Sequence, residues 1–501
     1  YGKLTEQRKF TPPEWNKHFS SKIAIKPAIE ADVKPEKTLK IPSRFKQFLI
    51  FSKRDIASKF SNKQYLTINF LEAPVLALLL AFIIRYSSDS DAGYVFRENP
   101  NIPAFFFMSI IVALFMGLTV SAEEIFKDQK ILKRESFLNL SRYSYLQSKV
   151  AILFSLSAIQ TLLFVVIGDV ILGISGMGFA FWLVMFSISC FANILGLNIS
   201  SAFNSAVTIY ILIPLLIIPQ LILSGVVVNF DKLNPILGNN HKVPIIGEMM
   251  ASKWGYEALV VNQFKENDFT SNFYSYDQTI ANSEYKSVYL YSEIQSSLDF
   301  IHANMNSTDA EIESKVAQQL LLIQNELSHE IERGGIPKDK LKSLPLLTPE
   351  GFTTEVYEDT SGFIELMRKV YNNQIKKAIK ARDELTKSMT DTEEKQKEFA
   401  ALKDSHENEA IVFFLKNSTA DHRILVTDDE LIQKIYPIYK NPVASHALDF
   451  RAHFYAPEKH FMGQHYDTLS FNVVIIWLMS LLLFIMLYFD IFRKVVNLFG
   501  Q

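Results

Sequence analysis

Four histidines in residues 446–465 are the side chains whose types and spacing come closest to a metal site. His446, His453 and His460 follow one another at intervals of seven residues, and His465 comes five residues later. Histidines four residues apart on a helix can share a metal ion, whereas a spacing of seven separates the side chains by about 10 Å. We therefore predict surface histidines here and no metal site.

The sequence contains no catalytic or nucleotide-binding motif. The Gly-x-x-x-x-Gly-Lys-[Ser/Thr] loop that cradles the phosphates of ATP is absent, and no Ser-His-Asp or Cys-His arrangement has a local signature. The single cysteine, Cys190, excludes an internal disulfide framework and a Cys-rich zinc module. A formal net charge of −2 provides no basic domain for nucleic acid. We predict no catalytic residue, metal or cofactor in this chain, and no nucleic-acid partner.

Six apolar stretches predict that the chain crosses a membrane. A bilayer core of about 30 Å requires roughly 20 mostly apolar residues per helix. The six windows that reach or approach this length are Leu66–Tyr86, Pro103–Val120, Val150–Leu172, Phe179–Leu197, Ala206–Leu223 and Leu469–Tyr488. Buried helices of a soluble protein are the alternative, but the recurrence of such uncharged runs favours an α-helical membrane protein with six transmembrane helices.

Lys and Arg residues near the ends of these helices predict their orientation. Basic residues gather before the first helix, between the second and third helices, and after the sixth. We therefore place both termini in the cytoplasm, and residues 226–467, between the fifth and sixth helices, on the opposite side.

The chain divides into five predicted parts. Residues 1–40 form a cytoplasmic linker, and residues 41–64 form an amphipathic connecting helix. Residues 65–225 hold the first five transmembrane helices and include a charged cytoplasmic loop at 121–149. Residues 226–467 are an inserted, mainly α-helical domain. The last part, residues 468–501, is the sixth helix with a short tail.

Capping boxes predict helices within the inserted domain. Thr308-x-x-Glu311 and Thr390-x-x-Glu393 each place a hydroxyl and a carboxylate where they can satisfy free backbone amides. The first helix ends before Gly334, a second runs over Phe363–Met389, and the third reaches about Leu415. We predict that these helices form a bundle over residues 308–415 that projects from the membrane.

Glu72 is the one acidic residue well inside a predicted transmembrane helix. A carboxylate within a bilayer is costly, so it faces a cavity or a partner. Arg85 is too far along the helix to pair with it, at nearly 20 Å by helical rise. The alternative is that the helix begins later and Glu72 lies near the headgroups.

Two motifs resemble a known family. Glu123, Asp128, Arg134, Glu135 and Arg142 occupy positions comparable to those of the first cytoplasmic loop of G-type ABC-2 transporter permeases, the White and pleiotropic-drug-resistance-like group. Tyr145 and Lys149 also fit that pattern, whereas Asn139 stands where the family usually has Gly.

The second motif, Ala251–Phe264, is similar to the family's Ser-Pro-x-Arg-Tyr-x-x-Glu-Ala-Leu-x-x-Asn-Glu-Phe signature, with Trp254, Gly255 and Tyr256 at its aromatic core and Glu257 at its acid. The resemblance covers residues 40–265 and 468–495. The large insertion has no counterpart in eukaryotic members and resembles that of bacterial homologues, in which an ATPase precedes the permease on one chain.

This resemblance implies a type-2 ABC exporter permease in the bacterial inner membrane that works as a homodimer. ATP and Mg would bind an ABC ATPase domain located upstream of Tyr1 or on a separate chain. The alternating charges of Glu123–Lys133 suit a helix that docks on that motor, with Glu123, Asp128, Arg134, Glu135 and Arg142 as motor-coupling residues. The alternative is a loop that merely follows the charge rule.

The resemblance also places a substrate pathway between two protomers, along the second and fifth helices. Its predicted lining comprises Glu72, Phe106, Phe107, Phe115, Met116, Ile211, Leu215 and Gln220. Aromatic and Met side chains suit amphipathic or lipid-like cargo, although contact with membrane lipid explains any one of them equally well. Trp254, Tyr256 and Glu257 are predicted to anchor a re-entrant or interfacial segment.

Two other functions remain open. In a mechanotransmission system, the motor would drive the inserted domain to act on a periplasmic partner, and nothing would cross the membrane. In a receptor, the inserted domain would be an external sensor, although six helices are more than a sensor needs.

Overall fold

The computed structural model describes residues 10–23, 42–87, 93–135, 140–234, 236, 242–420, 422–427 and 430–499. The chain divides into two compact units, residues 1–43 and residues 44–501. The first unit contains α1 (Pro12–Lys22), which begins with two prolines and a capping box between Thr11 and Glu14. The rest of the predicted linker, residues 1–9 and 24–40, lies outside the described residues.

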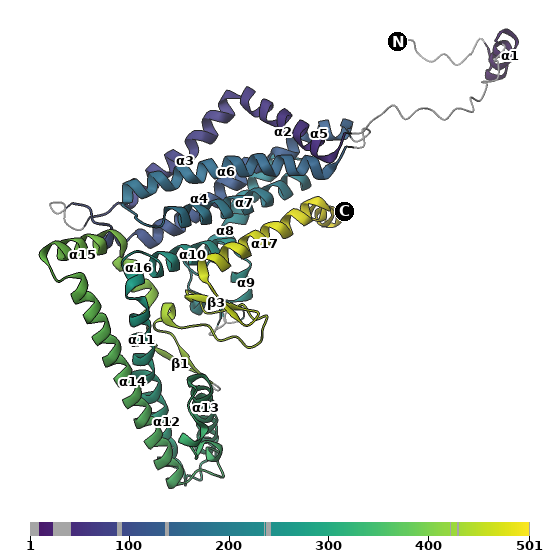
Figure 1. Cartoon of the computed structure of the whole chain (residues 1–501). Helices are drawn as coiled ribbons and strands as arrows, with labels where there is room; N and C mark the ends of the chain where they lie inside the picture. The colour runs from purple at the N-terminus through teal and green to yellow at the C-terminus, as the bar shows by residue number, and fades with distance from the viewer. Residues whose placement is uncertain are drawn as a thin grey trace. The chain divides into compact units, whose positions relative to one another are not determined.

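The second unit is built on a group of apolar helices (Figure 1). Its helices outside the inserted segment are α2 (Arg44–Ser61), α3 (Lys63–Ile84), η1 (Phe96–Glu98), α4 (Ile102–Ser121), α5 (Glu124–Glu135), α6 (Arg142–Leu172), α7 (Gly178–Ala202), α8 (Ala206–Ile222), α17 (Thr468–Tyr488) and α18 (Ile491–Phe499). Among the described residues, five helical stretches are long and apolar enough to cross a membrane: α3, α4 with α5, α6, α7 and α17. The helix α8, with 17 residues, is a shorter apolar helix, so the described residues contain five of the six predicted transmembrane helices at full length.

Helix α7 lies at the centre of this group and packs against α4, α6 and α17. It approaches α4 closely at Gly117 and Gly196. A Cβ atom added at Gly117 would lie 2.5 Å from the carbonyl oxygen of Ser189, and one at Gly196 would lie 2.0 Å from Oγ of Ser121. Small residues at such crossings let two helix backbones pack together inside a membrane.

Replacing Gly117 with alanine is therefore expected to lower the free energy of unfolding by about 1–3 kcal/mol, the range for overpacking a filled core. The matched control is Gly362→Ala in α14, where an added Cβ meets nothing within 4 Å and alanine favours the helix. Thermal unfolding of the detergent-purified chain gives the comparison. Equal midpoints for the two variants would contradict close packing of α4 on α7.

The inserted segment, residues 226–467, connects α8 to α17. It contains η3 (Phe230–Lys232), α9 (Ile245–Glu248), α10 (Ala251–Lys265), η4 (Thr270–Asn272), α11 (Tyr274–Glu284), η5 (Tyr285–Leu290), α12 (Tyr291–Asn304), α13 (Ala310–Gly334), η6 (Lys338–Lys340), η7 (Leu344–Leu346), α14 (Thr354–Met389), α15 (Glu393–His406), α16 (Glu409–Lys416) and η8 (Pro437–Tyr439). Its strands are β1 (Ile424–Val426), β2 (Leu431–Gln433), β3 (Glu458–Phe461) and β4 (Gln464–Asp467), which form two antiparallel pairs, β1–β2 and β3–β4. Leu425 pairs with Ile432, and His460 pairs with His465.

A helical bundle forms within the inserted segment, but its members differ from those predicted. Helices α12, α13 and α14 share one apolar core, which includes Leu298, Ile323 and Ile364. Helix α11 packs along α14 (Figure 1). The sequence patterns did not predict α11 and α12, and the predicted bundle included α15 and α16, which add no residue to this buried core.

The helix ends also differ from the capping boxes. Asp309, not Thr308, caps α13, because its side chain accepts from the amide of Glu311 at 3.0 Å. Thr392, not Thr390, caps α15. Helix α14 begins at Thr354, ahead of the predicted Phe363.

The predicted third helix is broken in two because Asn408 is used in tertiary contacts. Its side chain caps α16 by accepting from the amide of Ile411 at 3.1 Å. Its amide nitrogen donates to the carbonyl oxygens of Phe96 at 2.8 Å and Asn99 at 2.9 Å. Asn408 thus attaches the inserted segment to the connection between α3 and α4.

Asn408→Ala is expected to lower the free energy of unfolding by about 1–3 kcal/mol, because it leaves buried backbone acceptors without a donor. Asn408→Asp keeps the cap but removes the two donated hydrogen bonds, so its loss should be close to that of alanine. Asn373→Ala on the exposed face of α14 is the control. The measurement is thermal unfolding in detergent, and wild-type midpoints for both position-408 variants would refute the attachment.

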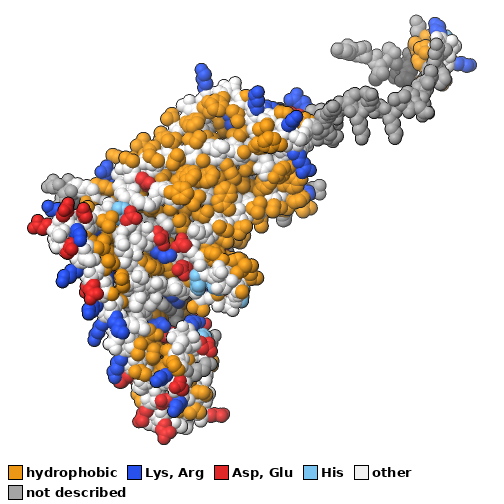
Figure 2. Space-filling model, in the orientation of Figure 1, with side chains coloured by type: hydrophobic (Ala, Val, Ile, Leu, Met, Phe, Trp, Pro, Cys, Tyr) orange, Lys and Arg blue, Asp and Glu red, His pale blue; other side chains and the backbone are white. Residues whose placement is uncertain are grey.

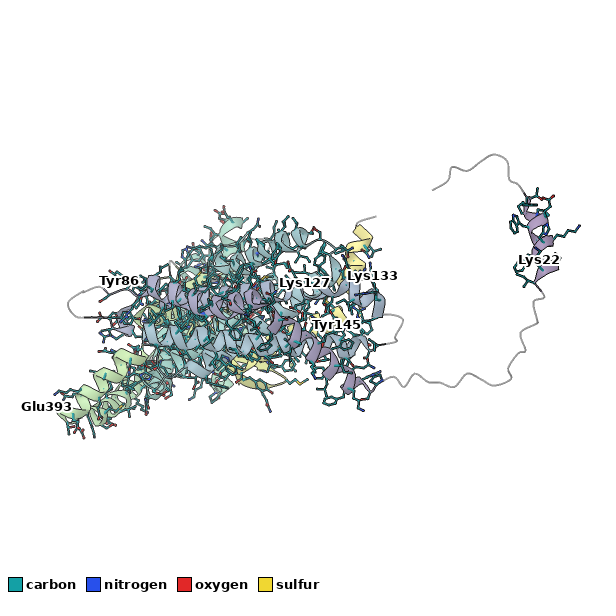
Figure 3. All side chains as sticks on the ribbon, turned by 90° about the horizontal axis from the view of Figure 1, so that it is seen from above. Lys22, Tyr86, Lys127, Lys133, Tyr145 and Glu393 are labelled. Atoms are coloured by element: carbon teal, nitrogen blue, oxygen red, sulfur yellow. The ribbon has the colours of Figure 1, made fainter. Side chains whose placement is uncertain are left out.

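The charged segment around α5 lies at the opposite end of the helices from this attachment. Lys133 and Tyr145 lie at one end, and Tyr86 lies at the other (Figure 3). Glu393, in α15, lies on the Tyr86 side. The charged segment and the attachment of the inserted segment thus lie at opposite ends of the helices, and the predicted sides of the membrane stay a prediction.

Candidate functional site

Five charged residues join α2, α5 and the start of α6, and we call them the coupling cluster: Asp55, Lys59, Glu124, Asp128 and Lys149. The ammonium of Lys149 lies 2.7 Å from Oδ1 of Asp55, 2.9 Å from Oε2 of Glu124 and 3.0 Å from Oδ2 of Asp128. The Lys149 side chain is only 4% exposed. Lys59 forms further ion pairs with Asp55 and Glu124. One buried cation on α6 therefore holds carboxylates from two other helices.

Local sequence positions these carboxylates. Glu124 and Asp128 are four residues apart on α5, so both side chains project from one face of the helix. Glu124 also lies in the first turn, where the helix dipole favours a negative charge. The same rule places Asp55 and Lys59 together on one face of α2.

Hydrogen bonds also hold the first two turns of α5 against α7 and α6. The amides of Ile125 and Phe126 both donate to Oγ of Ser200 at 3.0 Å. The hydroxyl of Tyr145 donates to Asp128 at 3.0 Å. Because its first turn is hydrogen-bonded to α7 and its carboxylates are paired with α6, α5 is tied to two of the long apolar helices.

A cavity of about 480 Å³ lies beside the coupling cluster, lined by α2, α5, α6 and α18. Ion pairs border it: Arg54 contacts Glu135 at 2.6 Å, and Arg142 pairs with Asp490. The guanidinium of Arg142 also donates to the carbonyl oxygen of Leu487 at 3.1 Å. Arg142 thereby links the start of α6 to the end of α17.

Four of the five predicted motor-coupling residues form ion pairs here. Asp128, Glu135 and Arg142 bridge different elements, and Glu123 pairs with Lys127 within the α5 segment at 2.6 Å. Arg134 is exposed. The sequence analysis did not place Asp55 or Lys59 at this site, although their spacing of four residues was a usable signal.

The predicted substrate pathway divides into two groups. Phe106, Phe107 and Met116 are at most 4% exposed and pack in the protein core, where Phe106 contacts Phe181 and Phe107 contacts Tyr256. In this conformation they therefore line no open surface, and their place in a substrate pathway stays a prediction.

The other pathway residues are more accessible. Phe115, Ile211 and Leu215 are 42–65% exposed, on an apolar surface of the kind that Figure 2 shows around the long helices. Gln220 is buried, and its side-chain oxygen accepts from the amide of Ser252 at 3.0 Å. Glu72 lies partly buried well inside α3, which begins at Lys63, so helix position alone does not place it at a helix end.

The predicted interfacial anchor is an internal ion network. Glu257 of α10 is fully buried and lies 3.2 Å from the ammonium of Lys253 and 2.7 Å from that of Lys459 in β3. Asn472 of α17 donates at 3.1 Å to Oε2 of Glu257, the oxygen that also contacts Lys253. We call Lys253, Glu257, Lys459 and Asn472 the anchor network, and it joins the inserted segment to α17.

The aromatic residues of this motif are buried as well. Trp254 is 1% exposed, and its indole nitrogen donates to the carbonyl oxygen of Glu248 at 2.7 Å; Tyr256 has no exposed surface. The network and the aromatic core of α10 enclose both side chains inside the protein, and their role in anchoring a re-entrant or interfacial segment stays a prediction. Although burial alone would raise it, the neighbouring Lys253 and Lys459 lower the pKa of Glu257 to about 2.

The four histidines of residues 446–465 do not converge. His460 and His465 face each other across the β3–β4 pair, with ring centroids 5.5 Å apart, and His446 is exposed. His453 hydrogen-bonds the carbonyl oxygen of Pro437 at 2.8 Å. Burial, with Lys440 nearby, lowers the pKa of His453 to about 3.

Comparison with known families gives the class of protein that this arrangement defines. Residues 46–264 match the family model of the ABC-2 type transporter. The match runs from α2 to the end of α10, so it contains the whole coupling cluster and the Trp254–Glu257 motif. No curated protein sequence matches the chain.

The chain therefore carries an ABC-2 type transporter domain, which supports an ABC-2 permease: the transmembrane component of an ABC transporter. The predicted family resemblance is confirmed at this level. The ABC-2 permease family implies pairing with an ABC ATPase domain, and the match together with the apolar helices indicates a multi-pass membrane protein.

Proposed function

We propose that this chain is the permease portion of an ATP-driven ABC exporter in the bacterial inner membrane, acting as a homodimer on amphipathic or lipid-like cargo. The coupling cluster carries the proposal. A motor that docks on α5 needs a rigid path to the membrane helices, and Lys149 joins α5 and α2 to α6 through three ion pairs of 3.0 Å or less.

The proposed cycle uses these contacts in order. ATP and Mg bound by the motor supply the closure of two motor domains. That closure moves α5, and the paired carboxylates carry α2 and α6 with it. Nucleotide shifts the balance between inward- and outward-open states only as far as it binds one of them more tightly. The exposed apolar residues Phe115, Ile211 and Leu215 would face the second protomer or lipid.

Mechanotransmission is the second candidate, and the attachments of the inserted segment favour it. The anchor network ties α10 and β3 to α17, and Asn408 ties α16 to the α3–α4 connection. Movement of the membrane helices would therefore reach the α11–α14 bundle even if no cargo crossed. In that system the bundle would act on a periplasmic partner.

One reconstitution distinguishes these functions. The full protein, purified from its own cells with any associated ATPase, is placed in liposomes with a fluorescent phosphatidylethanolamine, and leaflet exchange is followed with and without ATP. ATP-dependent lipid movement supports the exporter. ATP hydrolysis that changes the distance between spin labels at Lys376 and Tyr86, without lipid movement, supports mechanotransmission. Absence of any ATPase activity would overturn both and favour a receptor.

A further inference from the structure

A second cavity, of about 200 Å³, lies within the inserted segment. The connection after α8, helix α16, strand β2 and residues 453–455 contribute to its wall. Much of this wall is aromatic: Phe230, Phe413, Phe414 and Phe454 all line it. The rings of Phe230 and Phe454 lie 5.1 Å apart.

Basic residues outnumber acidic ones among the described residues of this wall. Of these residues, Lys242, Lys434 and Lys440 are the lysines, and Asp231 is the one carboxylate. Lys434 is paired with Asp231 at 2.7 Å, and Lys242 is paired with Asp449 outside the lining at 2.5 Å. Lys440 forms no ion pair with any residue that the structure describes.

The surroundings of Lys440 lower the pKa of its ammonium group. Burial and the nearby guanidinium of Arg333 lower its pKa to about 8, so the side chain still carries a proton at pH 7. The neighbouring His453 is neutral at that pH, and its Nε2 forms a hydrogen bond with the carbonyl oxygen of Pro437. The carboxylates of Glu326 and Glu430 lie near enough to raise the pKa of Lys440, and a bound anion would pair with this partly buried ammonium directly and stabilise it.

Two tyrosines beside the cavity have a strained backbone. Tyr455 in the lining has a φ angle of +66°, and Tyr436, beside the lining residue Pro437, has +57°. Asn417 has +45° as the C-cap of α16, where asparagine commonly adopts this conformation. Residues without glycine's freedom rarely adopt this region. Such strain gathers at ligand-binding sites, where the surrounding structure holds it in place.

We propose that this cavity binds a small organic anion that has an apolar part. The carboxylate or phosphate of the ligand lies at Lys440, and its apolar part lies against the phenylalanine rings. A charged group among aromatic walls selects such ligands over free inorganic ions, because each part contributes separately to affinity. The binding site is independent of the proposed transport, since it needs neither ATP nor movement of cargo.

The test uses the full protein in phosphatidylcholine nanodiscs, with isothermal titration calorimetry. The probes are 4-phenylbutyrate, the matched cation 4-phenylbutylamine, acetate and inorganic phosphate. We expect 4-phenylbutyrate to bind at least tenfold more tightly than the other three. Nanodiscs with phosphatidylglycerol distinguish the source of the anion: weaker probe binding there identifies a lipid headgroup as the occupant, and unchanged binding identifies a water-soluble ligand.

Three variants locate the site. Lys440→Met should weaken 4-phenylbutyrate at least tenfold, whereas Lys342→Met, which removes an exposed lysine elsewhere in the segment, should have no effect. If Lys440→Met does not fold, Phe413→Ser replaces it, because Phe413 is 58% exposed and its substitution should be tolerated. Phe413→Ser should weaken the binding of 4-phenylbutyrate and leave the binding of acetate unchanged. Equal affinity for 4-phenylbutyrate and 4-phenylbutylamine, or wild-type affinity in folded Lys440→Met or Phe413→Ser, would overturn the proposal.

Discussion

Replacing Glu257 with leucine is expected to lower the free energy of unfolding by about 3–5 kcal/mol, the range for breaking a buried ion pair from one side. The variant leaves Lys253 and Lys459, at most 1% exposed, without the carboxylate they share. It also removes the acceptor for the backbone amide of Tyr455, which donates at 3.1 Å. The thermal unfolding midpoint of the detergent-purified chain measures the loss.

Two comparisons make this prediction specific. Glu355→Leu, at an exposed position on α14, should stay within about 0.5 kcal/mol of wild type. Glu257→Leu combined with Lys459→Met should be more stable than Glu257→Leu alone, because one unpaired cation is removed. If the single and double variants unfold alike, the anchor network does not hold the inserted segment to α17.

The pKa of Glu257 also predicts how the free energy of unfolding changes at acid pH. The folded-state pKa of Glu257 is about 2, below its ordinary value of 4.5. The ionised Glu257 carboxylate therefore makes its full contribution to the free energy of unfolding above pH 4.5, and this contribution is lost as the pH falls from 4.5 toward 2. The stability difference between wild type and Glu257→Leu should shrink over that interval.

Replacing Lys149 with methionine is expected to detach α5 from the membrane helices. The substitution keeps most of the side-chain volume but leaves three carboxylates facing one another with Lys59 as their remaining paired cation. The expected loss is again about 3–5 kcal/mol. Trypsin cleavage after the basic residues of α5, followed by mass spectrometry, should become much faster than in wild type.

The control for Lys149→Met is Lys127→Met on the neighbouring segment. Lys127 is 64% exposed and pairs with Glu123 four residues away, and exposed pairs of this kind contribute about 0–1 kcal/mol. Its trypsin cleavage pattern should change only by loss of the site at position 127. Slow cleavage of α5 in folded Lys149→Met would show that the coupling cluster does not hold the helix.

The long helices could be predicted from the sequence because the thickness of a bilayer sets their length. Predicted and observed ends agree closely at Pro103–Val120 against α4 and at Leu469–Tyr488 against α17. The lining of a pathway could not be predicted in this way. Helix α4 is apolar on all sides, so its pattern does not distinguish the buried Phe106 from the exposed Phe115.

The coupling cluster and the anchor network could be predicted only in part, because each joins residues that are far apart in the sequence. The charged character of α5 and the Trp254–Glu257 motif are local features, and the sequence shows both. The partners of these residues are distant: Lys149 and Asp55 are 94 residues apart, and Lys459 and Glu257 are 202 apart. The break at Asn408 likewise depends on acceptors at Phe96 and Asn99, which no local capping rule includes.

The most direct test of coupling through this cluster is the number of fluorescent phosphatidylethanolamine molecules moved per ATP hydrolysed, measured in liposomes for wild type, Lys149→Met and Lys342→Met. We predict that Lys149→Met retains ATP hydrolysis by the motor but moves at least tenfold fewer lipids per ATP. Lys342→Met, which changes an exposed lysine of the inserted segment, should match wild type. A folded Lys149→Met protein with the wild-type ratio would contradict coupling through this cluster.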